Sequence, residues 1–360
     1  MSKKRIFDNR AFAHFQTLMD IVSPSMDEVP MATYLRDKWR QAGANVTTDV
    51  MGNIYASVGN GHPLNLGLIA HMDTVAVQIT KILPGGHLQM RHIGLRPHTL
   101  LGQAMKVVTR NGIIEGVIGF DPTSQYGQPK GLVEEDLWMD IGAESYEEAE
   151  EMVQVGDLAV LAPRFVKMGP YALCGTAIDD RVGLFVIDEC LTWFADHAVA
   201  VNLYFMGSVQ EEVGLRGAAV TASNVKLDAC ITVDVDYATD TPTPHENQMG
   251  TLHLGKGVGL HVKADINPVL RRIALETACE NNIPYQQSVG RFIYGGTDST
   301  ALQVQKAGIA TLNANIPCRY MHSPVEMCDT RDIESCIRLI ISLIEKLGRT
   351  GLCRFIPGCD

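Results

Sequence analysis

The stretch Leu64–Val75, LNLGLIAHMDTV, joins an apolar run to a histidine and an aspartate. A continuous run of this kind is typical of a buried strand that is covered on both faces, as in a parallel sheet. Residues two apart on an extended segment point to the same side. We therefore expect Asp73 to approach the imidazole of His71 and to fix its tautomer, as carboxylates beside metal-binding histidines do.

Strands and helices alternate on both sides of this stretch. Within residues 8–44, apolar residues recur at helical spacing up to Pro24, and a second helix is expected from about Asp27 to Gly43. Further strands are predicted at 54–58, 199–209, 227–235 and 309–315, and further helices at 179–191, 215–223, 267–279 and 329–347. This alternation predicts an α/β fold with a mixed, largely parallel sheet whose functional residues lie at the carboxyl ends of the strands.

A different pattern occupies residues 75–173. Short apolar runs alternate there with turn sequences such as Pro84-Gly85-Gly86 and Asn111-Gly112, and one helix is expected at 145–152. The pattern predicts a small, mostly-β insertion, so that residues 1–74 and 174–360 form one discontinuous α/β domain.

Charge and cysteine content limit the function and location. The net charge of −11 over 360 residues argues against nucleic-acid and anionic-membrane partners, which select basic surfaces. The sequence has neither an apolar run long enough to span a membrane nor a secretory signal, so we expect a cytoplasmic protein. Nine cysteines without a CxxC pair are typical of reduced thiols. Pairing or metal binding by Cys353 and Cys359 is a minor alternative.

Acidic and histidine side chains follow several of the predicted strands. They are His71, Asp73, Asp179, Asp180, Glu211, Glu212, Asp234 and His322. Each has an ordinary explanation alone; Asp179 and Asp180, for example, could cap the next helix. Together, however, they are the ligand types of hydrolytic zinc, cobalt or manganese sites. Five such ligands hold two metals when one carboxylate bridges them, and a further glutamate is then left as a general base.

The Glu211-Glu212 pair favours the same chemistry. Adjacent residues on an extended backbone point in opposite directions, so one carboxylate could bind metal while the other faces a substrate. The same geometry disfavours a glycosidase, which needs two carboxyl groups that face each other across about 5–10 Å.

Seven segments carry a resemblance to a known family: AHMDTV (70–75), LWMDIGAES (137–145), GTAIDDRVG (175–183), VQEEVGLRGA (209–218), VDVDYATDTP (233–242), GGTDSTA (295–301) and RYMHSP (319–324). With them the chain resembles, over nearly its whole length, the tetrahedral FrvX-like dinuclear metallo-aminopeptidases, which include glutamyl, leucyl and deblocking enzymes. The resemblance implies a zinc-exopeptidase-like catalytic domain, interrupted by a barrel-like domain used for dimerisation and assembly.

The resemblance also implies roles for individual residues. His71, oriented by Asp73, and Asp234 would bind one divalent metal ion, Glu212 and His322 would bind a second, Asp179 would bridge them, and Glu211 would be the general base. Zinc is the first candidate metal, with cobalt or manganese as alternatives. Peptides would be the substrates, and the chain would form a dimer-based homo-oligomer, of which a dodecamer is one form.

Several points stay open at this stage. Thr74 stands where relatives often have a carboxylate, which puts substrate preference in doubt. Gly295–Asp298 is a candidate pocket segment, and Lys256 and Arg319 are candidate partners of an acidic substrate side chain. A deacylase or carboxypeptidase of the same clan, or a non-catalytic scaffold stabilised by metal, are the alternative functions.

Overall fold

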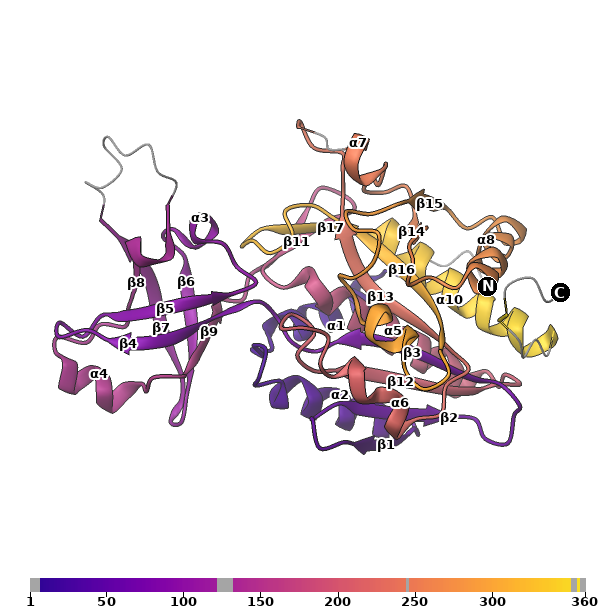
Figure 1. The fold of residues 1–360 in the computed structure, drawn as a ribbon, viewed down its shortest axis with the longest axis horizontal. Coiled ribbons are helices and arrows are strands. Elements are labelled where there is room, and N and C mark those ends of the chain that lie inside the picture. The colour runs from indigo at the N-terminus through magenta and orange to yellow at the C-terminus, as the bar shows by residue number, and fades with distance from the viewer. Residues whose placement is uncertain (1–6, 122–131, 244–245, 351–354, 357–360) are drawn as a thin grey trace.

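The computed structural model describes residues 7–121, 132–243, 246–350 and 355–356. The α/β domain contains an eight-stranded sheet, and a closed barrel lies to one side of this domain (Figure 1). The predicted fold class, an α/β domain interrupted by a barrel-like β domain, is therefore confirmed.

The large sheet has the strand order β1-β2-β12-β3-β13-β16-β14-β15. Its strands are β1 (Asn45–Thr48), β2 (Ile54–Val58), β3 (Asn65–His71), β12 (Asn202–Ser208), β13 (Ala229–Tyr237), β14 (Val258–His261), β15 (Tyr285–Ser288) and β16 (Ala310–Cys318). The four central strands β12, β3, β13 and β16 are parallel, whereas β1, β2 and β14 pair antiparallel with a neighbour. The four parallel strands therefore end at the same edge of the sheet.

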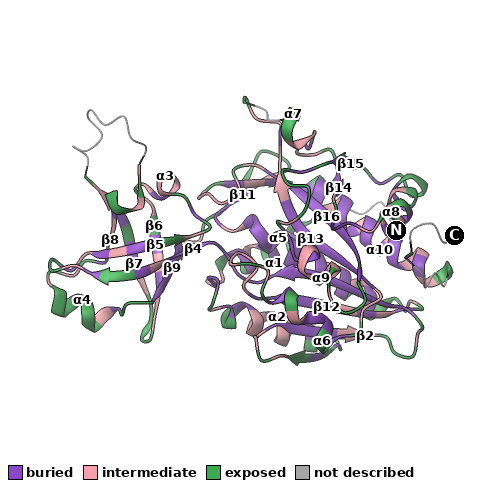
Figure 2. Ribbon diagram, in the orientation of Figure 1, coloured by how far each residue is buried: buried purple, intermediate pink, exposed green. Residues whose placement is uncertain are grey.

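Helices cover both faces of this sheet. The described helices of this domain are α1 (Asn9–Asp20), α2 (Val29–Gln41), α5 (Ile178–Asp196), α6 (Ala218–Asn224), α7 (Glu246–Met249), α8 (Pro268–Glu280), α9 (Asp298–Gln303) and α10 (Thr330–Thr350), of which α7 has no buried residue. Alternate residues of β3 enter two different cores: Leu68 packs with residues of α1, α5 and α10, and Ile69 packs with residues of α6 and α9. Every residue of β3 is buried, as Figure 2 shows for the centre of the sheet. This double burial explains why its sequence is continuously apolar.

The barrel closes in the order β4-β5-β8-β7-β6-β9 around its own apolar core. Its strands are β4 (Ala76–Ile82), β5 (Leu88–Ile93), β6 (Ala104–Thr109), β7 (Gly112–Phe120), β8 (Leu137–Asp140) and β9 (Leu158–Leu161). A short helix α3 (Pro97–Leu100), a 3-10 turn (Glu134–Asp136) and α4 (Tyr146–Met152) accompany them. The expected helix at 145–152 is α4, which Ser145 caps by accepting a hydrogen bond from the Glu148 amide.

A three-stranded sheet connects the barrel to the α/β domain. Its strands β10 (Phe165–Met168), β11 (Ala172–Gly175) and β17 (Glu326–Asp329) pair antiparallel in that order. The sequence pattern did not predict β10, β11 or β17, because strands of four residues show too little periodicity.

The cysteines of the described segments are all free thiols, and all except Cys279 are buried. Cys353 and Cys359 lie outside the described residues. Within the described residues, no helix is long and apolar enough to cross a membrane.

Candidate metal centre

The predicted ligands gather at the carboxyl edge of the parallel strands. His71 is the last residue of β3, and Asp234 lies in β13. Glu212 follows the end of β12 and His322 follows the end of β16. Asp179, at the start of α5, reaches the same place from the helix side. The shared edge of the sheet brings together residues that are far apart in the sequence.

His71 lies between Asp73 and Asp179. Its Nε2 is 3.0 Å from Asp179 Oδ1, and its Nδ1 is 3.1 Å from the backbone oxygen of Asp73 and 3.4 Å from the Asp73 carboxylate. A carbonyl oxygen only accepts hydrogen bonds, so Nδ1 carries the hydrogen and the Nε2 lone pair of a neutral ring faces Asp179. The nearer partner of Nδ1 is thus the backbone of Asp73.

His322 lies on the other side of the same aspartate. Its Nε2 is 3.3 Å from Asp179 Oδ2 and 3.3 Å from Glu212 Oε1. Its Nδ1 is 3.1 Å from the backbone oxygen of Gly94. Each oxygen of Asp179 therefore lies beside a different imidazole, as a carboxylate shared between two cations would.

Two groups of three side chains are close enough to hold a cation. One is His71, Asp179 and Glu212, and the other is His71, Asp180 and Asp234, with the ligand atoms of each group within 4.8 Å of one another. Asp180 Oδ1 accepts a hydrogen bond from the Gly183 amide, three residues further on, and the backbone of Asp180 is not helical although it lies within the bounds of α5.

The electrostatics of the cluster favour bound cations. Burial raises the pKa of Glu211 and of Asp234 well above the usual carboxyl range, and neighbouring carboxylates raise both further. Burial opposes charge on His71, but its contacts with Asp179 and Asp73 outweigh this and raise its pKa. Asp180 Oδ2 is buried without a hydrogen-bond partner, and Glu212 Oε1, which is also buried, lies 3.3 Å from His322 Nε2. Buried carboxylates in excess, beside two histidines whose Nε2 atoms face them, fit divalent metal ions.

Asp73 fixes the turn that carries the glutamate pair. It accepts hydrogen bonds from the backbone amides of Glu211 (3.0 Å) and Glu212 (3.2 Å) and from Ser25 Oγ (2.7 Å). Although burial opposes its ionisation, the contact with His71 and these bonds keep its pKa below the usual value. The pair lies in a turn after β12, so our expectation of an extended backbone there was wrong. Glu212 lies beside His322, and the charges that act on Glu211 are those of His71, Asp234, Glu212 and Asp298.

Glu326 is a buried residue of this site that the sequence analysis missed. It accepts hydrogen bonds from the backbone amides of Asp179 (3.0 Å) and His322 (2.7 Å). Burial, helped by the nearby Asp179 charge, raises the pKa of Glu326 to about 8. It lies on the unpredicted strand β17, so no motif or periodicity marked it.

A cavity of about 260 Å³ opens beside the carboxylates. The wall away from them includes Asp236, His261, Lys263, Arg291, Phe292 and the candidate segment Gly295–Thr297. Lys263 Nζ donates to the backbone oxygen of Gly295 at 2.9 Å. Thr74 is not part of the wall, since it is buried against the backbone of Ser23.

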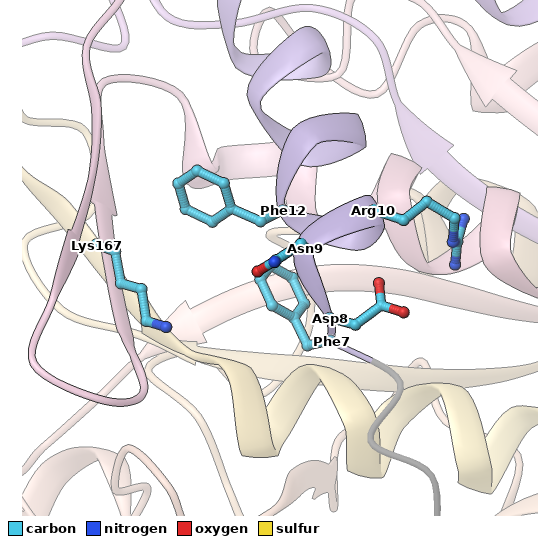
Figure 3. Close-up of a pocket in the computed structure, with 6 residues that line it drawn as sticks. All are labelled: Phe7, Asp8, Asn9, Arg10, Phe12 and Lys167. Atoms are coloured by element: carbon cyan, nitrogen blue, oxygen red, sulfur yellow. The ribbon is translucent and has the colours of Figure 1, made fainter.

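Neither of the two cations proposed from sequence lines this cavity. Arg319 forms an ion pair with Asp240 at 2.6 Å, and Lys256 is exposed on a turn before β14. A separate hollow of about 630 Å³ at the start of α1 (Figure 3) is lined by Phe7, Asp8, Asn9, Arg10, Phe12 and Lys167. That lining contains no histidine and a single carboxylate, so it offers no comparable ligand set.

The chain matches known proteins both in sequence and in fold. Residues 52–339 match the model of the M42 glutamyl aminopeptidase family. The lysyl aminopeptidase of Pyrococcus furiosus is 33% identical over 86% of this chain and 90% of its own length. The crystal structure of a TET aminopeptidase from a marine sediment Thaumarchaeota archaeon superposes with a TM-score of 0.89, at 31% identity over 94% of this chain and 97% of that one. The TET1 peptidase of Pyrococcus horikoshii, described as assembling into a tetrahedron or a large octahedral shell, gives a TM-score of 0.85 at 30% identity, over 94% of this chain and all of that one.

Proposed function

This chain belongs to the M42 glutamyl aminopeptidase family, and on that premise we propose that it is a dinuclear metallo-aminopeptidase that releases N-terminal residues from peptides. The observation that carries the proposal is the place of Asp179. Its two oxygens lie 3.0 Å and 3.3 Å from Nε2 of two different histidines, each of which holds its Nδ1 against a backbone carbonyl. Such an arrangement suits one carboxylate shared by two cations.

Two divalent ions, zinc first and cobalt or manganese as alternatives, would be held by five side chains. His71 and Asp234 would hold one, Glu212 and His322 the other, and Asp179 both. When bound, the ions supply Lewis acidity that lowers the pKa of a water and polarises the peptide carbonyl.

Glu211 is the general base in this proposal. It belongs to neither three-residue ligand group, although it lies on the cavity wall beside both. It takes a proton from the attacking water and delivers it to the nitrogen of the leaving amine. Asp73 is a positioning residue, because its carboxylate holds the backbone amide of Glu211 and its neighbour.

The cavity wall favours an acidic side chain at the N-terminal position of the substrate. Lys263 and Arg291 line it, and among the described residues no carboxylate forms an ion pair with either. The carboxylate of Asp236 is already engaged by His261 at 2.6 Å. Away from the metal-site carboxylates, the wall thus offers two cationic side chains without an ion-pair partner among the described residues, and one carboxylate that His261 contacts. We therefore propose glutamyl or aspartyl peptides as preferred substrates, although one relative is a lysyl aminopeptidase.

We also propose that the insertion, residues 75–173, mediates assembly of a dimer-based homo-oligomer that reaches a closed shell. The support is the likeness in fold to the Pyrococcus horikoshii TET1 peptidase, for which such shells are described.

A peptide series with free and N-acetylated copies tests the proposed reaction. The purified protein is stripped of metal and restored with zinc, cobalt or manganese, and released N-terminal residues are measured. We expect activity that depends on metal and is lost on acetylation. Cleavage mainly of acetylated copies would instead identify a deacylase. Two bound metals without any hydrolysis would favour the scaffold alternative.

A further inference from the structure

We propose that the β insertion takes part directly in the metal centre, because the backbone carbonyl of Gly94 orients His322. The position of the insertion would then set the affinity of one cation subsite, the one formed by Asp179, Glu212 and His322. This inference rests on the proposed dinuclear centre, and it concerns which part of the chain builds that centre.

The two histidines of the centre are held by different parts of the protein. His71 Nδ1 contacts the backbone oxygen of Asp73, two residues away in the same segment. His322 Nδ1 contacts the backbone oxygen of Gly94, which is 228 residues away and follows β5 of the barrel. An acceptor on Nδ1 fixes both the tautomer and the ring direction of a metal-binding histidine, and losing it typically costs 10–100-fold in metal affinity.

His322 depends on this contact more than a buried histidine would. Its side chain is 27% exposed, against 2% for His71, so packing restrains it less. Its backbone has a φ of +61°, and its amide donates to Glu326. The backbone is therefore anchored, and the ring is held at its two ends: Gly94 contacts Nδ1, and the metal-site carboxylates lie beside Nε2.

Gly94 is held in place by the first residues of the insertion. Its φ of +77° lies in the left-handed region, and it forms an isolated bridge with Ala76. A Cβ at this position would lie 2.3 Å from Val75 Cγ1 and 3.5 Å from Glu212 Oε2. Both the backbone angle and the lack of space require glycine here, so that any side chain must displace the carbonyl.

The other subsite has no such link to the insertion. Its residues in the proposed centre, His71, Asp179 and Asp234, lie on β3, α5 and β13, all within the α/β domain. Moving the end of β5 should therefore weaken one subsite and leave the other intact. This selectivity separates a positioning role for Gly94 from a general loss of stability.

The test compares Gly94→Ala with Gly102→Ala. Gly102 lies in the same insertion at a φ of +66°, and nothing stands within 4 Å of its added Cβ. Both changes strain a left-handed residue, but only the first disturbs the contact with His322. Metal-free proteins are titrated with Co²⁺, followed by visible absorption and by metal content after dialysis, with His322→Ala as the reference for loss of this subsite.

We expect two equivalents of Co²⁺ in the wild type and in Gly102→Ala. In Gly94→Ala one equivalent should bind as in the wild type and the other about 10–100-fold more weakly. The double variant Val75→Ala/Gly94→Ala, which removes the nearest clashing atom, should recover part of that affinity. If Gly94→Ala does not fold, the double variant is compared with Val75→Ala alone, and selective weakening is again expected.

The inference would be overturned if Gly94→Ala and Gly102→Ala bound Co²⁺ with equal affinities. It would also be overturned if both Co²⁺ equivalents were weakened equally in Gly94→Ala. Neither result would affect the proposed function. A wild-type protein that binds a single equivalent would instead contradict the dinuclear centre itself.

Discussion

Replacing Glu211 with glutamine tests the proposed general base with little other disturbance. The substitution exchanges one carboxylate oxygen for an amide nitrogen and keeps the shape of the side chain. The backbone amide of Glu211 still donates to Asp73, so the turn should keep its place. Because Glu211 belongs to neither ligand group, metal binding should remain.

The expected loss is in the rate of the chemical step. A positioned general base contributes about 10²–10⁴-fold, which corresponds to about 2.7–5.4 kcal/mol of activation free energy. The metal-free fold should not suffer. Burial raises the pKa of Glu211 in the folded protein, so the free energy of unfolding falls as pH rises above the unfolded pKa of about 4.5, where the unfolded chain releases a proton that the fold retains. Glutamine does not titrate, and the melting temperature of the metal-free variant should stay equal or rise.

The assay measures kcat on a free-amine peptide, metal content and melting temperature for Glu211→Gln and Glu212→Gln. The two variants make the same chemical change one residue apart. We expect Glu211→Gln to keep two metals per chain and lose turnover, and Glu212→Gln to lose affinity for one metal. If Glu211→Gln retained more than a tenth of wild-type kcat with both metals bound, Glu211 would not be the base.

Three further predictions concern other parts of the molecule. Lys263→Met should raise KM for glutamyl substrates by about 10-fold or more and leave leucyl substrates unchanged, since it removes a charged hydrogen-bond donor from the cavity wall; equal effects on both substrates would exclude the proposed acidic preference. Ser25→Ala should lower kcat by roughly tenfold through lost restraint on Asp73, with recovery in Ser25→Thr, and an unchanged kcat would show that Ser25 is dispensable. His14, 3.0 Å from Asp188 Oδ2, has a raised pKa because contacts with neighbouring carboxylates outweigh its burial. The stabilisation that protonated His14 gives the fold is therefore complete below the unfolded pKa of about 6.5 and is lost as pH rises through the folded pKa. His14→Gln should lower the melting temperature more at pH 6 than at pH 9. A loss of melting temperature that does not depend on pH would contradict this.

The variant Lys256→Met is the control for Lys263→Met. Lys256→Met changes an exposed lysine that does not line the cavity, so its kinetics should equal those of the wild type for every substrate. A loss of glutamyl activity in Lys256→Met as large as that in Lys263→Met would point to the overall charge of the protein and not to the cavity wall.

The sequence by itself determined the fold class and the set of candidate ligands. The apolar run before His71 indicates a strand of a buried parallel sheet, because a strand that is covered on both faces has no polar side. The ligands could be grouped because parallel strands present their carboxyl ends at one edge. Residues near the ends of β3, β12, β13 and β16 can therefore be expected to meet without any knowledge of side-chain contacts. These are local signals combined with one rule of topology.

Only the tertiary structure decided how the centre is supported and what lies beside it. Glu326 reaches Asp179 across 147 residues, and Gly94 reaches His322 across 228. Lys263 was no more conspicuous in the sequence than Lys256, and only folding placed one of them on the cavity wall. These contacts involve backbone groups or single side chains on short strands and turns. No periodicity marks such positions, because their partners are chosen by packing of distant segments and not by their neighbours in the chain.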